Sequence, residues 1–251
     1  MAIAHRRIGT GPVHVIVLHD WFGTCANWGS VLDHLDPERF SYVFLDYRGY
    51  GERRDVPGDH TLPEIADDVV ALADQLGWDT FSLLGHSMGG KAAQQVLVRV
   101  PERIEKLVGI APVPAAPYVM DEATHALFHG AARDPDKRRA IIDLVTGHRV
   151  GRHWLERMVA HSLAISRPEA FAAYLESWRT LDLSSAVKGN TVPVLALVGA
   201  YDLALTAELI RDTWQAWYPD CRVVVLPGSG HYPPHEAPVA FTTETEAFLA
   251  A

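Results

Sequence analysis

Along most of the chain, short apolar runs alternate with longer segments in which apolar residues recur every three or four positions. Val13–Leu18 is dominated by β-branched residues, a composition that favours a strand. Leu62–Leu76 has the spacing of a helix with one buried face, and Gly77 is placed to end that helix. Further strands are predicted at residues 42–45, 80–84 and Ile104–Ile110, and further helices at residues 27–35 and 88–100. This alternation predicts βα units around a mostly parallel, twisted sheet flanked by helices.

The alternation stops between residues 112 and 182, where only helical patterns occur. Because a loop of about 70 residues is unusual inside a compact domain, we expect a helical cap over the sheet edge. Its helices are predicted at residues 137–144, 154–165 and Pro168–Thr180. Beyond it, strands are predicted at residues 192–198 and 222–226, and helices at residues 207–217 and 238–249. The chain is therefore predicted to form a core of residues 1–111 and 183–251 with a cap inserted at residues 112–182.

Composition narrows the class of protein. Of the 251 residues, 48% are apolar and 21% are charged, which fits a globular chain with a sizeable core and excludes disorder, collagen and coiled coil. The net charge of −9 disfavours a nucleic-acid partner, because such binding depends on clustered Lys and Arg. Two cysteines, Cys25 and Cys221, form no disulfide framework and no metal motif.

No membrane-spanning or leader segment is expected. The longest uncharged run, residues 107–120, has 14 residues and three prolines, whereas a spanning helix needs about 20 apolar residues. Residues 1–7 lack the apolar stretch of a signal peptide. We therefore predict a cytoplasmic protein.

The sharpest chemical motif is Gly-His-Ser-Met-Gly-Gly at residues 85–90, which follows a predicted strand and opens a predicted helix. This is the context of a G-x-S-x-G nucleophile elbow. Gly85 and Gly89 leave room at a tight turn where a Cβ atom would clash. The hydroxyl of Ser87 then stands at a helix N-terminus, where free N–H groups favour a developing oxyanion.

Two other interpretations of this segment compete with the elbow. Residues 85–91 also fit G-x-x-x-x-G-K, the start of a phosphate-binding loop, but Ala92 stands where a magnesium-binding Ser or Thr is required. The second is a tight strand–helix turn with an incidental serine. Neither explains the acidic and basic residues found farther along the chain.

A serine needs a base, and the base needs a carboxylate that orients it. Asp202 follows the predicted strand 192–198, and His231 follows the predicted strand 222–226. Strand ends of a parallel sheet meet at one edge, so Ser87, Asp202 and His231 are predicted to form a catalytic triad. Asp182 is the chief rival for the acidic position.

The other histidines compete for the role of base or of metal ligand. His86 is held beside the serine by the turn and is expected to point away from it. Two pairs are spaced by four residues, His125 with His129 and His231 with His235, but neither has a third ligand at suitable spacing. We therefore predict no metal site, and a serine mechanism needs no organic cofactor.

An oxyanion hole requires two backbone N–H groups aimed at the substrate oxygen. One is expected from Met88, which follows the serine, and the other from Trp21 in the loop His-Asp-Trp-Phe-Gly at residues 19–23. Trp21 and its neighbour Phe22 are also expected to wall the pocket. Further pocket residues are predicted in the cap at Tyr118, Met120, Phe128, Trp154, Met158 and Trp178.

Taken together, these motifs resemble the α/β-hydrolase fold superfamily over nearly the whole length. The matching segments include Asp-Tyr-Arg-Gly-Tyr-Gly at residues 46–51, Gly199-x-x-Asp202 and Gly228-x-Gly230-His231. Residues 85–92 followed by residues 101–108 look like small bacterial carboxylesterases with a helical cap. The resemblance implies the α/β-hydrolase fold with a cap insertion. One departure is Asp20, where the family commonly has glycine, so that a carboxylate beside the hole either repels an oxyanion or binds a polar substrate group.

The predicted function is a serine hydrolase that cleaves small apolar or aromatic carboxylic esters through an acyl-enzyme. A lactone, amide or carbon–carbon hydrolase with the same triad is an alternative, and so is a ligand-binding or signalling protein with little turnover. Haloalkane dehalogenation is excluded because it needs a carboxylate at position 87. The oligomeric state stays open.

Overall fold

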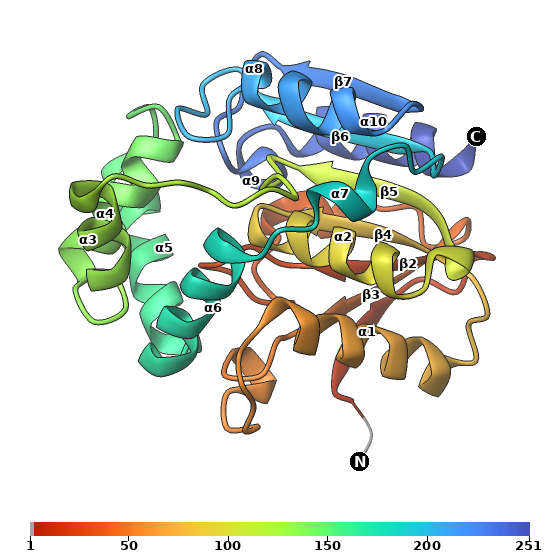
Figure 1. Ribbon diagram of the computed structural model, residues 1–251, viewed down its shortest axis with the longest axis horizontal. Coiled ribbons are helices and arrows are strands. Elements are labelled where there is room, and N and C mark those ends of the chain that lie inside the picture. Colours follow the sequence, from red (N-terminus) through yellow and green to blue (C-terminus); the bar gives the residue numbers. More distant parts are fainter. Residues whose placement is uncertain (1–2) are drawn as a thin grey trace.

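The computed structural model of the chain describes residues 3–251 and contains a seven-stranded sheet with helices on both faces (Figure 1). The strand order is β1-β3-β2-β4-β5-β6-β7, and only β1 runs antiparallel to its neighbour, β3. The strands are β1 (His5–Ile8), β2 (Val13–Leu18), β3 (Phe40–Leu45), β4 (Phe81–His86), β5 (Ile104–Ile110), β6 (Val194–Gly199) and β7 (Cys221–Leu226). The predicted mostly parallel sheet is therefore confirmed.

The sheet separates two apolar cores, and alternate residues of each inner strand enter different ones. In β2, Ile16 and Leu18 pack on the side of α1 (Leu62–Leu76) and α2 (Met88–Arg99), whereas Val15 and Val17 pack on the side of α10 (Pro238–Ala250). Strands buried on both faces explain why the predicted strands read as almost continuous apolar runs.

Between β5 and β6 the described residues form helices and no strand, apart from an isolated bridge between Tyr50 and Ser166. These helices are α3 (Glu122–Gly130), α4 (Pro135–Val145), α5 (Arg152–Ile165), α6 (Pro168–Thr180) and α7 (Ser184–Val187). Figure 1 shows α3 to α6 gathered on one side of the molecule, beside the sheet. The division of the chain into a core and a cap stays a prediction.

Two predicted helices differ from the structure. The helix at residues 27–35 is only a 3-10 segment, η1 (Gly29–Asp33), because Gly29 has a φ of 59° and interrupts any helix that begins before it. The helix at residues 207–217 is divided into α8 (Ala207–Ile210) and the π-helical segment η4 (Arg211–Gln215). The remaining short helix is α9 (Pro233–Glu236), directly after His231.

One buried lysine of α2 binds two parts of the chain between β5 and β6. Lys91 of α2 donates hydrogen bonds of 2.8 Å to the carbonyl oxygens of Ala116 and Trp178. Ala116 lies before α3, and Trp178 lies near the end of α6. The position that corresponds to the lysine of a phosphate-binding loop is thus occupied by a structural side chain.

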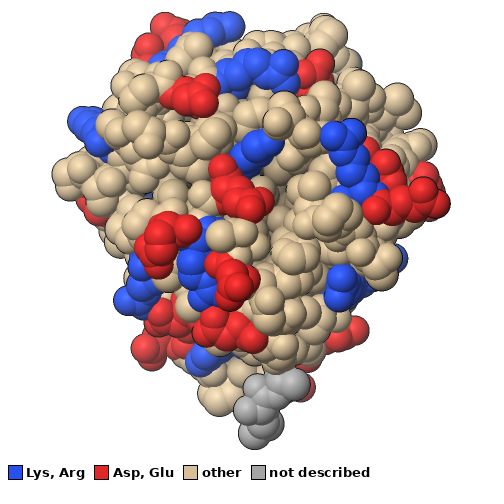
Figure 2. All heavy atoms as spheres, turned by 90° about the vertical axis from the view of Figure 1, so that its right-hand side faces the viewer, with Lys and Arg blue, Asp and Glu red and all other residues tan. Residues whose placement is uncertain are grey.

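The surface carries charges of both signs. Figure 2 shows Lys and Arg intermixed with Asp and Glu on the face that lies opposite α3 to α6, and neither sign covers that face of residues 3–251 continuously. Within residues 3–251, no helix combines the length and the apolar character that crossing a membrane requires. The predicted cytoplasmic location stays a prediction.

Candidate active site

Ser87 lies in the turn between β4 and α2 with a strained backbone. Its φ of 55° and ψ of −116° are unusual for a residue with a side chain. A Cβ atom at Gly85 would lie 2.3 Å from the carbonyl oxygen of Gly89, and one at Gly89 would lie 2.4 Å from that of Leu18. The Ser87 N–H donates to the carbonyl oxygen of Ile110 at 2.9 Å, which fastens the turn to β5. The glycines therefore permit the turn, and the neighbouring strand holds it.

His231 and Asp202 form a short buried contact between the loops that follow β7 and β6. The Nδ1 atom of His231 lies 2.6 Å from Oδ2 of Asp202. The other oxygen of Asp202 accepts the N–H groups of Ala204 and Leu205, each at 2.9 Å. Both oxygens of this carboxylate therefore have donors, which fixes its orientation.

The protonation of the His231–Asp202 pair follows from burial and from the contact itself. Burial opposes ionisation of Asp202, but the charge and hydrogen bond of His231 hold the pKa of this carboxyl below its usual value. Burial lowers the pKa of His231, and the charge and hydrogen bond of Asp202 outweigh that effect and raise it. An ionised Asp202 keeps a proton on Nδ1 of His231, so Nε2 is free to accept one.

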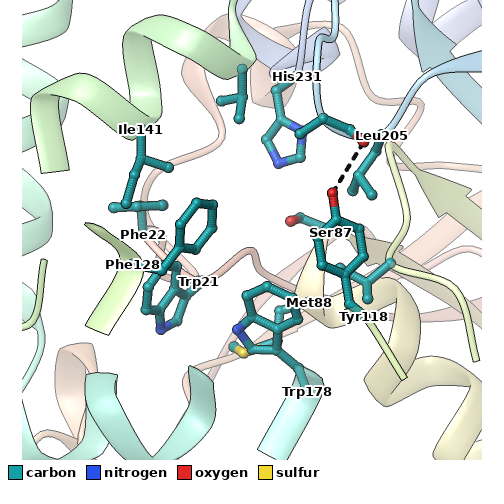
Figure 3. A pocket seen from close by; sticks show the side chains of 13 residues that line it. Trp21, Phe22, Ser87, Met88, Tyr118, Phe128, Ile141, Trp178, Leu205 and His231 are labelled. Atoms are coloured by element: carbon teal, nitrogen blue, oxygen red, sulfur yellow. Dashed lines mark hydrogen bonds between the residues drawn. The ribbon is translucent and has the colours of Figure 1, made fainter. Parts of the chain in front are cut away.

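Ser87 and His231 line the same cavity, which has a volume of about 50 Å³. Figure 3 shows the imidazole of His231 directed toward the hydroxyl of Ser87 across this cavity. No hydrogen bond joins these two side chains in the part of the chain that the structure describes. Such contacts are often long before substrate binds. The structure thus brings together the serine, imidazole and carboxylate that the sequence places after three different strands.

The loop after β2 is held by hydrogen bonds to three successive carbonyl oxygens. The hydroxyl of Tyr47 donates to the carbonyl of His19 at 2.8 Å, and the hydroxyl of Tyr50 donates to that of Trp21 at 3.0 Å. The Nδ1 atom of His19 lies 2.7 Å from the carbonyl oxygen of Asp20. The N–H of Trp21 donates no hydrogen bond within residues 3–251, so this amide is available to a ligand.

Met88 supplies a second available amide. It is the first residue of α2, and the N–H groups of a first helical turn have no partner in the helix. Met88 and Trp21 both line the cavity that contains Ser87. The two amides predicted to form an oxyanion hole therefore belong to residues on the walls of one cavity.

The carboxylate of Asp20 does not reach this cavity. Its Oδ1 atom accepts the N–H of Phe22 at 2.7 Å, and its Oδ2 atom lies 3.4 Å from Nδ1 of His86. Burial alone would raise the pKa of Asp20, but the hydrogen bond and charge of His86 lower it below the usual value. The structure therefore gives no support to a contact between Asp20 and an oxyanion or a substrate group.

The cavity is lined almost entirely by apolar side chains, some predicted and some not. Of the predicted pocket residues, Phe22, Tyr118, Phe128 and Trp178 line it. The lining residues that the sequence reasoning missed are Val113, Ile141, Val145, Ala204 and Leu205. Ile141 and Val145 are spaced by four residues on α4, and that spacing was the one signal available for them.

The other predicted pocket residues lie elsewhere. Trp154 and Met158 line a separate cavity of about 220 Å³ beside α5, together with His161 and His235. Met120 packs against the larger apolar core and is not among the residues that line the Ser87 cavity.

Trp21 also joins its loop to α6. Its indole stacks on Phe171 with a distance of 3.9 Å between ring centroids, and its Nε1–H donates to the Phe171 carbonyl at 2.8 Å. Phe128 of α3 stacks on the same indole at 5.8 Å. The loop after β2 therefore packs against both α3 and α6 at the cavity wall.

The rival site residues have other partners. Asp182 accepts the N–H of Ser184 at 2.9 Å and is exposed. His125 lies 3.0 Å from a carboxylate oxygen of Glu176. Across residues 3–251 no group of three or more His, Cys, Asp or Glu side chains is arranged to hold a metal ion.

Residues 13–238 match the family model described as alpha/beta hydrolase fold. The chain belongs to the alpha/beta hydrolase fold family. The predicted fold class is therefore confirmed, and a serine elbow followed by Asp and His after later strands is typical of this family.

Three relatives illustrate what the chain is similar to. It is 29% identical over 246 residues to a pimeloyl-[acyl-carrier protein] methyl ester esterase from Nitrosomonas europaea, covering 93% of this chain and 94% of the relative. An esterase from Exiguobacterium antarcticum superposes with a TM-score of 0.88 at 22% identity, covering 99% and 96% of the two chains. A thermophilic esterase from Thermogutta terrifontis gives 0.85 at 25% identity, covering 99% and 93%. These names agree with the predicted carboxylic ester hydrolase.

Proposed function

We propose that the protein is a serine esterase in which Ser87 attacks the ester carbonyl. His231 accepts the serine proton at Nε2 as the Ser87 oxygen bonds to the carbonyl carbon. Asp202 holds the imidazole in the required tautomer and stabilises the imidazolium that forms. The observation that carries this proposal is the shared cavity of Ser87 and His231, with the 2.6 Å contact to Asp202 behind the imidazole.

In the tetrahedral intermediate, the carbonyl oxygen becomes an oxyanion that accepts the N–H groups of Trp21 and Met88. The intermediate collapses when the bond to the alcohol oxygen breaks and the imidazolium of His231 returns its proton to that oxygen. A water molecule then attacks the acyl-enzyme, again with His231 as base, and releases the acid and the free serine.

The cavity supports small, uncharged groups on at least one side of the ester. A volume of about 50 Å³ holds only a few non-hydrogen atoms, well below the roughly 300 Å³ at which drug-sized pockets begin. Trp21, Phe22 and Ile141 provide apolar walls. The name of the Nitrosomonas relative supports methyl esters as one such class, in which the small alcohol group enters the cavity and a longer acyl chain leads out of it.

The test is hydrolysis of methyl and p-nitrophenyl esters with acyl chains of increasing length by wild type, S87A and S82A. Ser82 is a matched control, because it is a buried serine of β4 whose hydroxyl has no partner among the described residues. We expect S87A to lose about a million-fold in kcat and S82A to retain wild-type rates. Turnover retained by S87A would remove Ser87 from the mechanism.

The same panel separates the alternative functions. Faster turnover of lactones, amides or vinylogous diketones than of any ester would show that the triad acts mainly on one of those bonds. A stable adduct on Ser87 with a p-nitrophenyl ester, formed without release of acid, would favour a ligand-binding protein.

A further inference from the structure

His86 lies behind the site with acceptor oxygens at both of its ring nitrogens. Its Nε2 atom is 2.7 Å from the carbonyl oxygen of His231, and its Nδ1 atom is 3.4 Å from Oδ2 of Asp20. The imidazole is buried, with 3% of His86 exposed. A neutral imidazole has one N–H and one lone pair, whereas a carbonyl and an ionised carboxylate are both acceptors. An imidazole presents an N–H to each of these two oxygens only when both of its ring nitrogens carry protons.

The carboxylate of Asp20 extends this connection to the oxyanion loop. Its second oxygen accepts the N–H of Phe22 at 2.7 Å, one residue beyond the Trp21 amide. Hydrogen bonds and a close ionic contact therefore run from the loop after β2, through Asp20 and His86, to the backbone of His231. Asp20 stands where the family resemblance predicts glycine, which has no side chain to make this connection.

We propose that Asp20 and His86, as carboxylate and imidazolium, form a buried couple that positions the Trp21 amide relative to the imidazole of His231. The proposal rests on the function proposed above. Both members are positioning residues, since neither lines the cavity that contains Ser87. The couple has no net charge, so the carboxylate of Asp20 does not repel an oxyanion held at Trp21 and Met88.

The surroundings of His86 leave Asp20 as its counter-ion. The rings of His231 and Tyr232 have centroids 5.2 Å and 5.4 Å from that of His86, and Trp28 lies at 6.3 Å. None of these side chains carries a negative charge at neutral pH, and the pKa of Asp20 lies below its usual value. Asp20 is therefore the acidic side chain that lies against the ring of His86.

Two substitutions of Asp20 separate a positioning role from a general loss of structure. D20N keeps an oxygen acceptor for the Phe22 N–H, and its amide NH₂ donates to Nδ1 of a neutral His86. D20A removes both contacts. We expect D20A to lower kcat by roughly 10- to 100-fold with a small change in KM, because misplacing a catalytic group by about 1 Å costs that much. D20N is expected to retain kcat within about threefold.

A spectroscopic readout tests the protonation directly. In ¹⁵N-histidine NMR spectra at pH 7, assigned with an H86Q variant, we expect two ring N–H groups on His86 in wild type and one in D20N. The proposal is overturned if His86 of wild type carries a single ring proton. It is also overturned if D20A keeps the wild-type kcat, or if kcat of D20N falls as far as that of D20A.

These outcomes are distinct from failure of the proposed function. If wild type cleaves no ester, or if S87A cleaves esters as fast as wild type, the serine mechanism fails. The NMR measurement on His86 still decides whether the couple exists.

Discussion

The hydroxyl of Tyr50 donates a 3.0 Å hydrogen bond to the carbonyl oxygen of Trp21. Both residues are buried, and Trp21 carries one of the two amides proposed to bind the oxyanion. The Trp21 carbonyl shares its peptide plane with the Phe22 N–H, which donates to Asp20, so both sides of this peptide next to the Trp21 amide are held. The orientation of the loop after β2 therefore depends on a phenol from the turn after β3.

We expect Y50F to lower kcat of ester hydrolysis by about three- to tenfold and to leave KM nearly unchanged, since loss of oxyanion orientation acts on the transition state. Y42F is the matched control, because the hydroxyl of Tyr42 bonds to Glu246 on the other side of the sheet. Each variant is expected to lose about 1 kcal/mol of unfolding free energy. If both variants lower kcat equally, the Tyr50 hydrogen bond has no special role in the site.

The contact between His231 and Asp202 makes a second prediction, for the pH dependence of activity. A base must be unprotonated, and Asp202 raises the pKa of His231, so kcat/KM should fall as pH decreases through a value above the usual pKa of histidine. D202N removes the negative charge that raises the pKa of His231. The acid limb of the kcat/KM profile therefore moves to lower pH, and kcat falls by roughly 10⁴-fold. Steady-state rates between pH 5 and pH 9 measure both effects.

D182N is the control for the same experiment, because Asp182 was the rival acid and instead bonds to Ser184. It should leave the acid limb and kcat unchanged. A shift of the limb in D182N would reopen the assignment of the acid.

Segments of the fold in which apolar residues recur at a regular spacing were predictable. Leu62–Leu76 forms a helix with the predicted bounds, and Gly77 ends it in the left-handed conformation with a φ of 69°. Helix α3 (Glu122–Gly130) was not among the helices predicted by their bounds between residues 112 and 182, and none of its residues is fully buried. Phe128 of α3 lines the Ser87 cavity, but a helix whose residues are at most half-buried shows only a weak apolar period.

The site also has features that the sequence predicts and features that it does not. Ser87, Asp202 and His231 were predictable as neighbours because the carboxyl ends of parallel strands meet at one edge. The position of Ile141 in the cavity was not, because it depends on how α4 packs against the sheet, a contact between distant segments. The orientation of Asp20 was also beyond the sequence, since it depends on the position of His86 in the folded turn.

The cavity wall makes a third prediction, for substrate size. I141A removes an apolar side chain that lines the Ser87 cavity, so the enlarged cavity should shift the preferred ester to one about two or three carbons longer. The measurement is kcat/KM for alkyl esters of one acid, from methyl to octyl, because the alcohol group is the part of the ester that is proposed to enter this cavity. I142A is the matched control, since Ile142 is a buried neighbour on α4 that is not among the lining residues.

Both alanine variants should be destabilised by about 2–5 kcal/mol, as is usual when a buried isoleucine is truncated. The chain-length shift is therefore compared at a temperature where each variant stays folded. An equal shift in I142A would show that general loosening of α4, and not the wall itself, sets substrate size.

The buried ammonium of Lys91 makes a fourth prediction, for stability above neutral pH. Burial lowers the pKa of Lys91 to about 8, whereas an unfolded lysine has a pKa of about 10.4. Between these values the unfolded chain binds more protons than the folded chain, so this residue's contribution to stability rises with pH. Relative to K91M, wild type should gain unfolding free energy between pH 8 and pH 10, with a slope approaching about 1.4 kcal/mol per pH unit.

Urea denaturation at several pH values measures the difference, and K188M, at an exposed lysine, should show none of it. A flat difference between wild type and K91M over this range would mean that the Lys91 ammonium is not strained by its burial.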